Sequence, residues 1–441
     1  MTMLVTEASA PGGIEGTGDI VVVDHTTDNN LARFRFQLAD VKMSAAEEDF
    51  ELNGRKFRAG AFIIQNADGT KLDPVLRNLG LSAFATTAAP QVKTHDLDIP
   101  RIGYIHSWQR TQDEGWVRAA LDTYGIPYTY FADQKLRDGN LRQKYDVLVF
   151  PHVGGAAQSQ VNGIPKTGAD PVPYKKSELT PNLGALDQSD DIRGGMGLEG
   201  LLELSKFVEQ GGTLIVEGST SAIFPEYGLT SGVSVENPSS LFVRGSIVRG
   251  ILADKKSPLA YGFNEDSMPV YYNQEPVLAI AGGGGGFGGP GGGGGIPGVG
   301  MNITPMSTAP QQRISPLDPA DAPRQRGGGA PAAGQAGFGG RGGGPGAPSP
   351  AVRPRVVLQF PANADDMLLS GVLVGGQALA NRAQLVDAPL GKGHVVMFAI
   401  RPFWRWQTQG TFFFGFNAIL NWNDLDAGRA EGPRPTTLFP N

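Results

Sequence analysis

Cysteine is absent from this sequence of 441 residues. Its absence excludes disulfides, thiolate metal ligands and a cysteine nucleophile, but leaves the cellular compartment open. Histidine is scarce, with five residues available as metal ligands or acid-base groups. No apolar run approaches the roughly 20 residues that a transmembrane helix needs, and the first residues lack the basic start and apolar core of a signal peptide. We therefore expect neither a membrane span nor a signal peptide in this chain.

Charged residues are also few, at 18% of the chain, and the formal net charge is -6. Nucleic acid is not an expected partner, because Lys and Arg are scattered instead of clustered. Glycine and proline are abundant, with 63 and 33 residues, and most of the excess lies in one segment. The rest of the chain therefore has the composition of an ordinary globular protein.

Residues 204–218 give the clearest prediction of local structure. Leu204, Phe207 and Val208 recur at helical spacing, and a glycine pair then ends the helix. An apolar, β-branched run follows at 213–216. A strand that is apolar on both faces is typical of a parallel sheet covered by helices, so we expect further strand–helix units beside it.

Such units precede this stretch, with strand patterns at 101–107, 127–133 and 145–151. The first two are separated by a helical pattern that places Trp116 and Ala120, together with Tyr124, on one face. The alternation predicts parallel strands with right-handed connections.

Later segments return to the same sheet, through a glycine turn at 391–393, a strand at 394–400 and a closing helix at 411–422. The expected fold class is therefore α/β, a flavodoxin-like parallel sheet with helices on both faces. Its layout resembles class I glutamine amidotransferase-like domains, although the cysteine nucleophile of that class is missing.

Residues 19–98 predict a small, β-rich α+β region built on antiparallel pairing, which is not expected to fold alone. Residues 32–41 indicate a strand, because Phe34 and Phe36 alternate with arginines. Asn53-Gly54 is a hairpin signal, and a helical pattern at 72–81 is closed by glycine. Further on, short strands are expected within 258–264 and 268–280.

The Gly/Pro-rich segment is predicted to be a disordered insertion inside one domain, since regular patterns of the same sheet lie on both sides of it. Its glycines do not form a phosphate loop, because no Lys-Ser/Thr pair ends them. The predicted divisions are a disordered start (1–18), the α+β region (19–98), the first part of the α/β domain (99–281), the insertion (282–351), the last part of the α/β domain (352–425) and a tail (426–441).

A long polar loop at 152–197 follows the third strand of the α/β pattern. Sheets of this class bind ligands beyond the carboxyl ends of their strands, so His106, His152 and Glu217 form a candidate binding pocket. His152 and Glu217 could act as acid, base or ligand there. The structural alternative is that His152 is a loop residue and Glu217 a local cap.

Two H-x-x-D motifs begin at His25 and His95 and superficially resemble part of a zinc site. Neither has the surrounding fold that holds such a site, so we expect no metal site and no catalytic residue in this chain. His25 is better explained as a turn residue. The aromatic residues at 403–406 and 412–414 could stack on sugars, but core packing explains them better.

Several segments together resemble the carboxyl-terminal half of bacterial zinc carboxypeptidase-like proteins of the carboxypeptidase A family. The segments are VVDHTTDNNLARFRFQL, GRKFRAGAFII, RIGYIHSWQRTQDEGWVRAALDTYGIPYTY, YDVLVFPH, GGTLIVEG and GKGHVVMFAIRPFWRWQTQGTFFFGFNAIL. The resemblance implies a parent protein with a secretion signal, then a zinc peptidase domain, then an amidotransferase-like domain. The zinc ligands and catalytic residues belong to the preceding domain, and no position here matches them.

The expected function is that of a non-catalytic accessory region of a secreted or periplasmic zinc carboxypeptidase-like protein. Its partners would be the amino-terminal zinc peptidase domain and a peptide or cell-wall ligand. The alternative is an independent ligand-binding or hydrolytic amidotransferase-like domain that uses the pocket at the strand ends.

Overall fold

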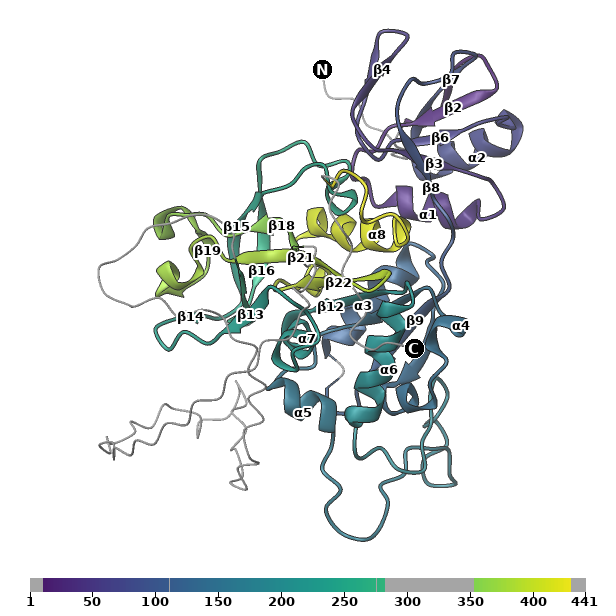
Figure 1. Ribbon diagram of the computed structural model, residues 1–441. Helices are drawn as coiled ribbons and strands as arrows, with labels where there is room; N and C mark the ends of the chain where they lie inside the picture. The colour runs from purple at the N-terminus through teal and green to yellow at the C-terminus, as the bar shows by residue number, and fades with distance from the viewer. Residues whose placement is uncertain (1–10, 111, 275, 282–352, 430–441) are drawn as a thin grey trace, which may run out of the picture. The chain divides into compact units, whose positions relative to one another are not determined.

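The computed structural model describes residues 11–110, 112–274, 276–281 and 353–429 (Figure 1). These residues form a twelve-stranded sheet, a six-stranded sheet and two two-stranded sheets. The α-helices are α1 Asn30–Gln37, α2 Gly69–Leu79, α3 Gln112–Thr123, α4 Leu141–Lys144, α5 Ala157–Asn162, α6 Gly197–Glu209, α7 Ile223–Glu226 and α8 Phe412–Leu420. None of the described helices is long and apolar enough to cross a membrane.

The strands of the large sheet are β9 Ile102–His106, β10 Thr129–Ala132, β11 Val147–Phe150, β12 Thr213–Glu217, β13 Val233–Glu236, β15 Ser246–Leu252, β16 Ser267–Tyr272, β17 Val277–Ile280, β18 Arg355–Gln359, β19 Leu368–Ser370, β21 Ala383–Leu390 and β22 Gly393–Phe398. Five of them, in the spatial order β10-β9-β11-β12-β22, pair in parallel. The parallel strands predicted from the apolar runs are therefore confirmed.

The expectation of a parallel sheet is wrong for the rest of this sheet, which is mixed. Beyond β22 the order continues through β21, β18, β15 and β16, and each of these pairs is antiparallel. The direction changes at the predicted glycine turn, where Gly391 adopts a φ of 61°. A tight hairpin of this kind joins antiparallel neighbours, whereas parallel neighbours need a crossover.

Both faces of the parallel strands are buried. On β11, Val147 and Val149 belong to one apolar cluster with residues of α3 and α8. Leu148 and Phe150 belong to a second cluster with residues of α5 and α6. Successive side chains of a strand point to opposite faces, so helices cover both sides of the parallel strands.

The six-stranded sheet has the order β1-β7-β2-β6-β3-β8, with antiparallel pairs except the parallel pair β1–β7. Its strands are β1 Gly13–Gly16, β2 Ile20–Val23, β3 Ser44–Ala46, β6 Phe62–Ile64, β7 Ser82–Thr86 and β8 Thr94–Asp96. Strand β1 lies within the stretch predicted to be a disordered start, so that prediction is wrong for residues 13–16. The Asn53-Gly54 hairpin is confirmed, between β4 Phe50–Leu52 and β5 Arg55–Phe57.

The strand predicted at 32–41 is wrong, because this segment continues helix α1. The alternation of Phe and Arg misled because Arg35 does not face solvent: it is buried, and its guanidinium donates to the carbonyls of Leu38 and Leu97. Leu31, Phe34 and Leu38 recur instead at helical spacing on a buried face.

Two smaller predictions also fail. The strand expected within 258–264 is a 3-10 turn, η3 Pro258–Ala260, where the Ser257 hydroxyl accepts from the Leu259 N–H and a proline opens the turn. On α3, Trp116 lies beside the buried face, which carries Asp113, Val117 and Ala120. A proline early in a segment favours a helical start over a central strand position.

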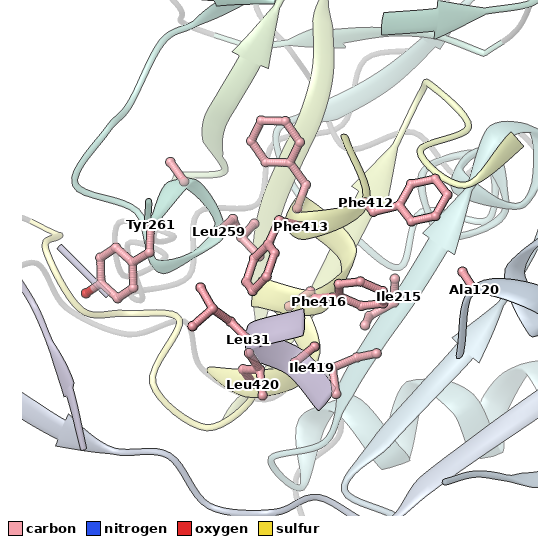
Figure 2. Packing of buried hydrophobic residues seen from close by; sticks show 14 of the residues in the cluster. Leu31, Ala120, Ile215, Leu259, Tyr261, Phe412, Phe413, Phe416, Ile419 and Leu420 are labelled. Carbon is pink, nitrogen blue, oxygen red and sulfur yellow. The ribbon is translucent and has the colours of Figure 1, made fainter. Parts of the chain in front are cut away.

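Helix α8 packs against both large sheets and links them. Leu31 of α1 belongs to the same apolar cluster as Ile419 and Leu420 of α8 and Ile215 of β12 (Figure 2). The 19–98 region therefore shares its core with the α/β part.

The two chain segments that flank residues 282–352 approach each other at Gly232. The Ala281 N–H donates to the Gly232 carbonyl at 2.9 Å, and a Cβ at Gly232 would lie 3.0 Å from Cδ of Pro354. Strands β17 and β18 on either side both pair with β21. The predicted insertion itself lies outside the described residues, as do residues 1–10 and 430–441. Two-stranded β14 Phe242–Val243 and β20 Leu373–Val374 complete the strands.

Candidate functional site

The carboxyl ends of the parallel strands carry the three residues predicted for the pocket. His106 is the last residue of β9, Glu217 is the last residue of β12, and His152 follows β11 by two positions. All three are buried. They lie in two different settings, because His106 lines a cavity whereas His152 and Glu217 belong to a neighbouring polar cluster.

The cavity has a volume of ≈ 610 Å³. One wall comes from β9, α3 and β10 and the other from the long polar loop, as expected for a loop that follows a strand's carboxyl end. Its lining residues are His106, Trp108, Glu114, Gly115, Arg118, Tyr130, Tyr174, Asn182, Gly184, Ala185, Leu186, Asp187 and Ile192.

The loop is attached to the sheet through His106 and Asp187. Nε2 of His106 lies 3.1 Å from Oδ2 of Asp187, and the Ala132 N–H donates to the same oxygen at 2.7 Å. The ammonium of Lys135 pairs with the other carboxylate oxygen. Burial alone would raise the pKa of Asp187, but these donors outweigh it and the pKa is lowered.

The protonation of His106 follows from this pair. Burial lowers the pKa of His106, and the hydrogen bond to Asp187 only partly opposes it, so the ring is neutral near pH 7. A carboxylate can only accept, so Nε2 carries the proton and donates to Asp187. Nδ1 is then an acceptor, and it has no hydrogen-bond partner.

Aromatic rings form much of the cavity wall. The His106 ring stacks on Tyr130 at 4.4 Å between centroids, with 5° between planes. Trp108 meets His106 edge-on at 4.6 Å and lies 4.7 Å from Tyr174 of the loop. The Arg118 guanidinium lies over the Tyr130 ring at 4.5 Å, a favourable cation–π arrangement.

Glu114 is the acid of this wall. The Tyr130 hydroxyl donates to Oε1 of Glu114, and the Arg118 guanidinium lies 3.9 Å from the same oxygen. Burial raises the pKa of Glu114 to about 7, even though both neighbours favour the charged form. Its second oxygen, Oε2, has no partner.

The neighbouring cluster contains Asp113, Arg401, His152 and Glu217. Nη1 of Arg401 lies 3.3 and 3.4 Å from the two carboxylate oxygens of Asp113. Burial raises the pKa of Asp113 to about 6, although Arg401 opposes the shift. Burial also raises the pKa of Glu217 well above its ordinary range, and the charge of Asp113 adds to this. Adjacent residues of α3 thus serve the cluster and the cavity.

His152 and Glu217 have local structural partners. Nδ1 of His152 accepts from the Ser219 N–H at 2.9 Å, and a Cβ at Gly218 would lie 2.5 Å from that nitrogen. The Glu217 carboxyl accepts from the Thr220 backbone as a cap of the following turn. Burial lowers the pKa of His152 well below its ordinary value. These two side chains therefore stabilise the strand ends beside the cavity.

The other sequence candidates lie in the protein core. Nε2 of His25 lies 3.1 Å from Oδ1 of Asn417, and Nε2 of His95 lies 2.8 Å from Oδ1 of Asn421. Within the described ranges, no group of three or more His, Cys, Asp or Glu side chains is placed to hold a metal ion. Phe403 and the phenylalanines at 412–414 are buried in the apolar core.

Sequence reasoning missed Glu114, Arg118, Tyr130 and Asp187 in the cavity wall. A signal existed for the first two, because they lie one helical turn apart on the helix that follows the His106 strand. Asp187 carried no comparable signal, because its partner lies 81 positions away in the sequence.

No family model matches the chain, and no curated protein is significantly similar to it. Among solved structures, a cytoplasmic protein of Salmonella typhimurium LT2 is similar at 10% identity and a TM-score of 0.34, covering 73% of this chain and 99% of that one. A putative GMP synthase protein of Thermoplasma acidophilum gives 9%, 0.33, 72% and 94%. A β-galactosidase of Bacillus circulans gives 10%, 0.32, 73% and 30%. All three TM-scores are below 0.5, so the description of the fold rests on this chain's own strand pairing.

Proposed function

We propose that this chain is a non-catalytic binding domain whose ligand occupies the cavity beside His106. The observation that carries the proposal is the cavity wall, in which the half-buried rings of Trp108, Tyr130 and Tyr174 stand beside Glu114 and Arg118. Small-molecule sites are typically about 300–1,000 Å³ in volume and combine apolar or aromatic walls with a few polar groups. A cavity of ≈ 610 Å³ fits that description.

We infer that the fold is a variant of the flavodoxin-like, class I glutamine amidotransferase-like arrangement. The five parallel strands and the helices packed on both of their faces support this assignment. In such sheets, ligands bind beyond the carboxyl ends of the strands, where this cavity lies. The sequence has no cysteine to serve as the usual amidotransferase nucleophile, which favours binding over that chemistry.

We propose further that the domain is the accessory region of a secreted or periplasmic zinc carboxypeptidase-like protein. The support is the sequence resemblance, which places zinc and its ligands in an amino-terminal peptidase domain of the parent protein. That domain would be the partner of this chain, and a peptide or cell-wall ligand would occupy the cavity. The accessory role would be substrate presentation or attachment to the cell wall.

Gly115 offers a direct test of binding. It lines the cavity on α3, and an added Cβ would meet no atom within 4 Å, so Gly115→Leu should fill the cavity without disturbing the fold. Gly410 is a matched control, because it lines a separate cavity of ≈ 540 Å³ and also has open space around it.

The measurement is a thermal-shift screen of the purified chain with sugars, amino acids, short peptides and cell-wall fragments. We expect a saturable rise in Tm for the wild type and for Gly410→Leu, and its loss in Gly115→Leu. A rise that persists unchanged in Gly115→Leu, or no rise with any compound, would overturn the proposal.

The non-catalytic part has its own test. Purified chain with added zinc should release no carboxyl-terminal residues from peptides, because the resemblance assigns the zinc ligands to another domain. Release at an enzyme-like rate would contradict the accessory role.

A hydrolytic use of the cavity is the second candidate, and the His106–Asp187 pair favours it. A neutral histidine oriented by a carboxylate, with its other nitrogen unpaired, is arranged as a general base. The test is hydrolysis of chromogenic esters and glycosides by the wild type and by His106→Gln. Activity that is lost in His106→Gln would establish this candidate, and equal rates in the two proteins would exclude it.

A further inference from the structure

We propose that the ligand of the cavity beside His106 is an uncharged saccharide. The inference rests on the proposed binding function and adds the chemical class of the ligand. Three features of the described lining residues support it: the pairing of charges, the exposed aromatic surface and the mixture of unpaired donors and acceptors.

The charged groups of the cavity wall are already paired. Arg118 lies 3.9 Å from Glu114 and 3.2 Å, through Nε, from the Tyr128 hydroxyl. Asp187 is paired with Lys135 and accepts from His106. Among the described lining residues, Arg118 is the cationic side chain, so an anionic ligand would have to compete with Glu114 for it. A ligand without net charge meets no such penalty.

The aromatic surface suits a ring with an apolar face. Trp108, Tyr130 and Tyr174 are half-buried, so part of each ring faces the cavity or its mouth. Leu186 lines the same cavity and is 65% exposed. The C–H face of a sugar ring packs well on such surfaces, while its hydroxyls point outward to polar groups.

The unpaired polar atoms of the wall are of both kinds. Nε1 of Trp108 is a donor, Nδ1 of His106 is an acceptor in the tautomer set by Asp187, and Oε2 of Glu114 is the third. Hydroxyl groups both donate and accept, so neighbouring sugar hydroxyls could satisfy all three atoms. Leaving such atoms unpaired costs about 1–3 kcal/mol each.

These three atoms are closed off from solvent by the wall itself. Tyr174 of the long loop packs on Trp108 at 4.7 Å, and Asp187 holds the loop to His106. A saccharide would therefore reach them when Tyr174 moves off Trp108. Binding should accordingly change the fluorescence of Trp108.

The experiment measures affinities for sugars that share one ring and differ in charge. Calorimetry with the full chain would compare glucose, N-acetylglucosamine and cellobiose with glucuronic acid and glucosamine. We expect at least one uncharged sugar to bind at least tenfold more tightly than its charged counterparts. Sedimentation with insoluble peptidoglycan distinguishes a polymer ligand from a free sugar, and binding in either arm supports the class.

Variants locate the binding. Trp108→Phe keeps an aromatic ring but removes the N–H, and should weaken binding about tenfold, the loss of about one hydrogen bond. Gly115→Leu should abolish binding, whereas Gly410→Leu should leave it unchanged.

Two results would overturn the inference while the proposed function stands: a charged sugar that binds as tightly as the uncharged one, or cavity binding restricted to amino acids or peptides and lost in Gly115→Leu. If no compound of any class binds, the proposed function fails as well.

Discussion

Burial keeps several carboxyl groups near the carboxyl edge from ionising at their ordinary pH. The pKa of Glu114 and of Asp133 is raised to about 7 and that of Asp113 to about 6, in each case chiefly by burial. Both oxygens of Asp133 lack a geometric hydrogen-bond partner. Perturbed acids of this kind gather at functional sites more often than elsewhere, which agrees with a site at this edge.

Glu114→Gln should change how stability depends on pH. The folded pKa of Glu114, about 7, lies above its ordinary value of 4.5, so the folded state binds the proton more tightly. The stability that this proton contributes is present below pH 4.5 and is lost as pH rises towards 7, by up to about 3 kcal/mol. The variant should lack that loss.

The measurement is the free energy of urea unfolding at several pH values between 4.5 and 7.5. Glu178→Gln, at an exposed loop position, is the control and should follow the wild type. Parallel curves for the wild type and Glu114→Gln would show that Glu114 titrates normally in the fold.

Asp113→Asn should be strongly destabilising, because it leaves the buried Arg401 guanidinium without its carboxylate. Breaking a buried ion pair on one side costs about 3–5 kcal/mol. Asp113→Asn combined with Arg401→Met should cost less than the two single changes added together. Strictly additive losses in chemical denaturation would mean that the two side chains are not coupled.

At the scale of elements, α8 connects the two large sheets through polar as well as apolar contacts. The Asn417 amide donates to the carbonyls of Leu259 and Tyr261 at 3.1 and 3.0 Å, and its oxygen lies 3.1 Å from Nε2 of His25. Asn417 is fully buried. One side chain thus joins α8, the η3 turn and the end of the first region.

Asn417→Leu should lower the free energy of unfolding by at least about 3 kcal/mol, because three buried polar groups would lose their partner. The wild type and the variant should both unfold in one cooperative transition, since the regions share a core. Circular dichroism and tryptophan fluorescence during urea unfolding would check this. Asn423→Leu, at an exposed position, should cost less than about 1 kcal/mol, and two separated transitions would contradict the shared core.

The elements also show where sequence patterns suffice. Runs that are apolar on both faces correctly predicted β9, β11, β12 and β22, because parallel pairing buries every residue of such strands. Helix α1 was missed because a buried arginine with carbonyl partners imitates a solvent-facing position. The predicted pocket was only half located: the strand ends placed His106 correctly, but the pairing with Asp187 depends on a loop path that no local pattern encodes.

At the scale of the whole molecule, the segment 282–352 is flanked by strands of one sheet. Because Ala281 and Pro354 both contact Gly232, a short connection can join them. Replacing residues 283–349 with a short Gly-Ser linker should therefore change the Tm by less than about 10 °C, since the cost of closing a loop rises only slowly with its length. A larger drop in a thermal melt would mean that the segment contributes packed structure.

The position of β22 sets when the molecule can be completed during synthesis. This strand lies between β12 and β21 in the sheet, yet more than a third of the chain separates it from β12 in sequence. At about 5–20 residues per second, a ribosome leaves the edge of β12 open for on the order of ten seconds or more. An apolar strand edge exposed for that time is a site for aggregation, so the nascent chain should depend on chaperones until α8 has been made.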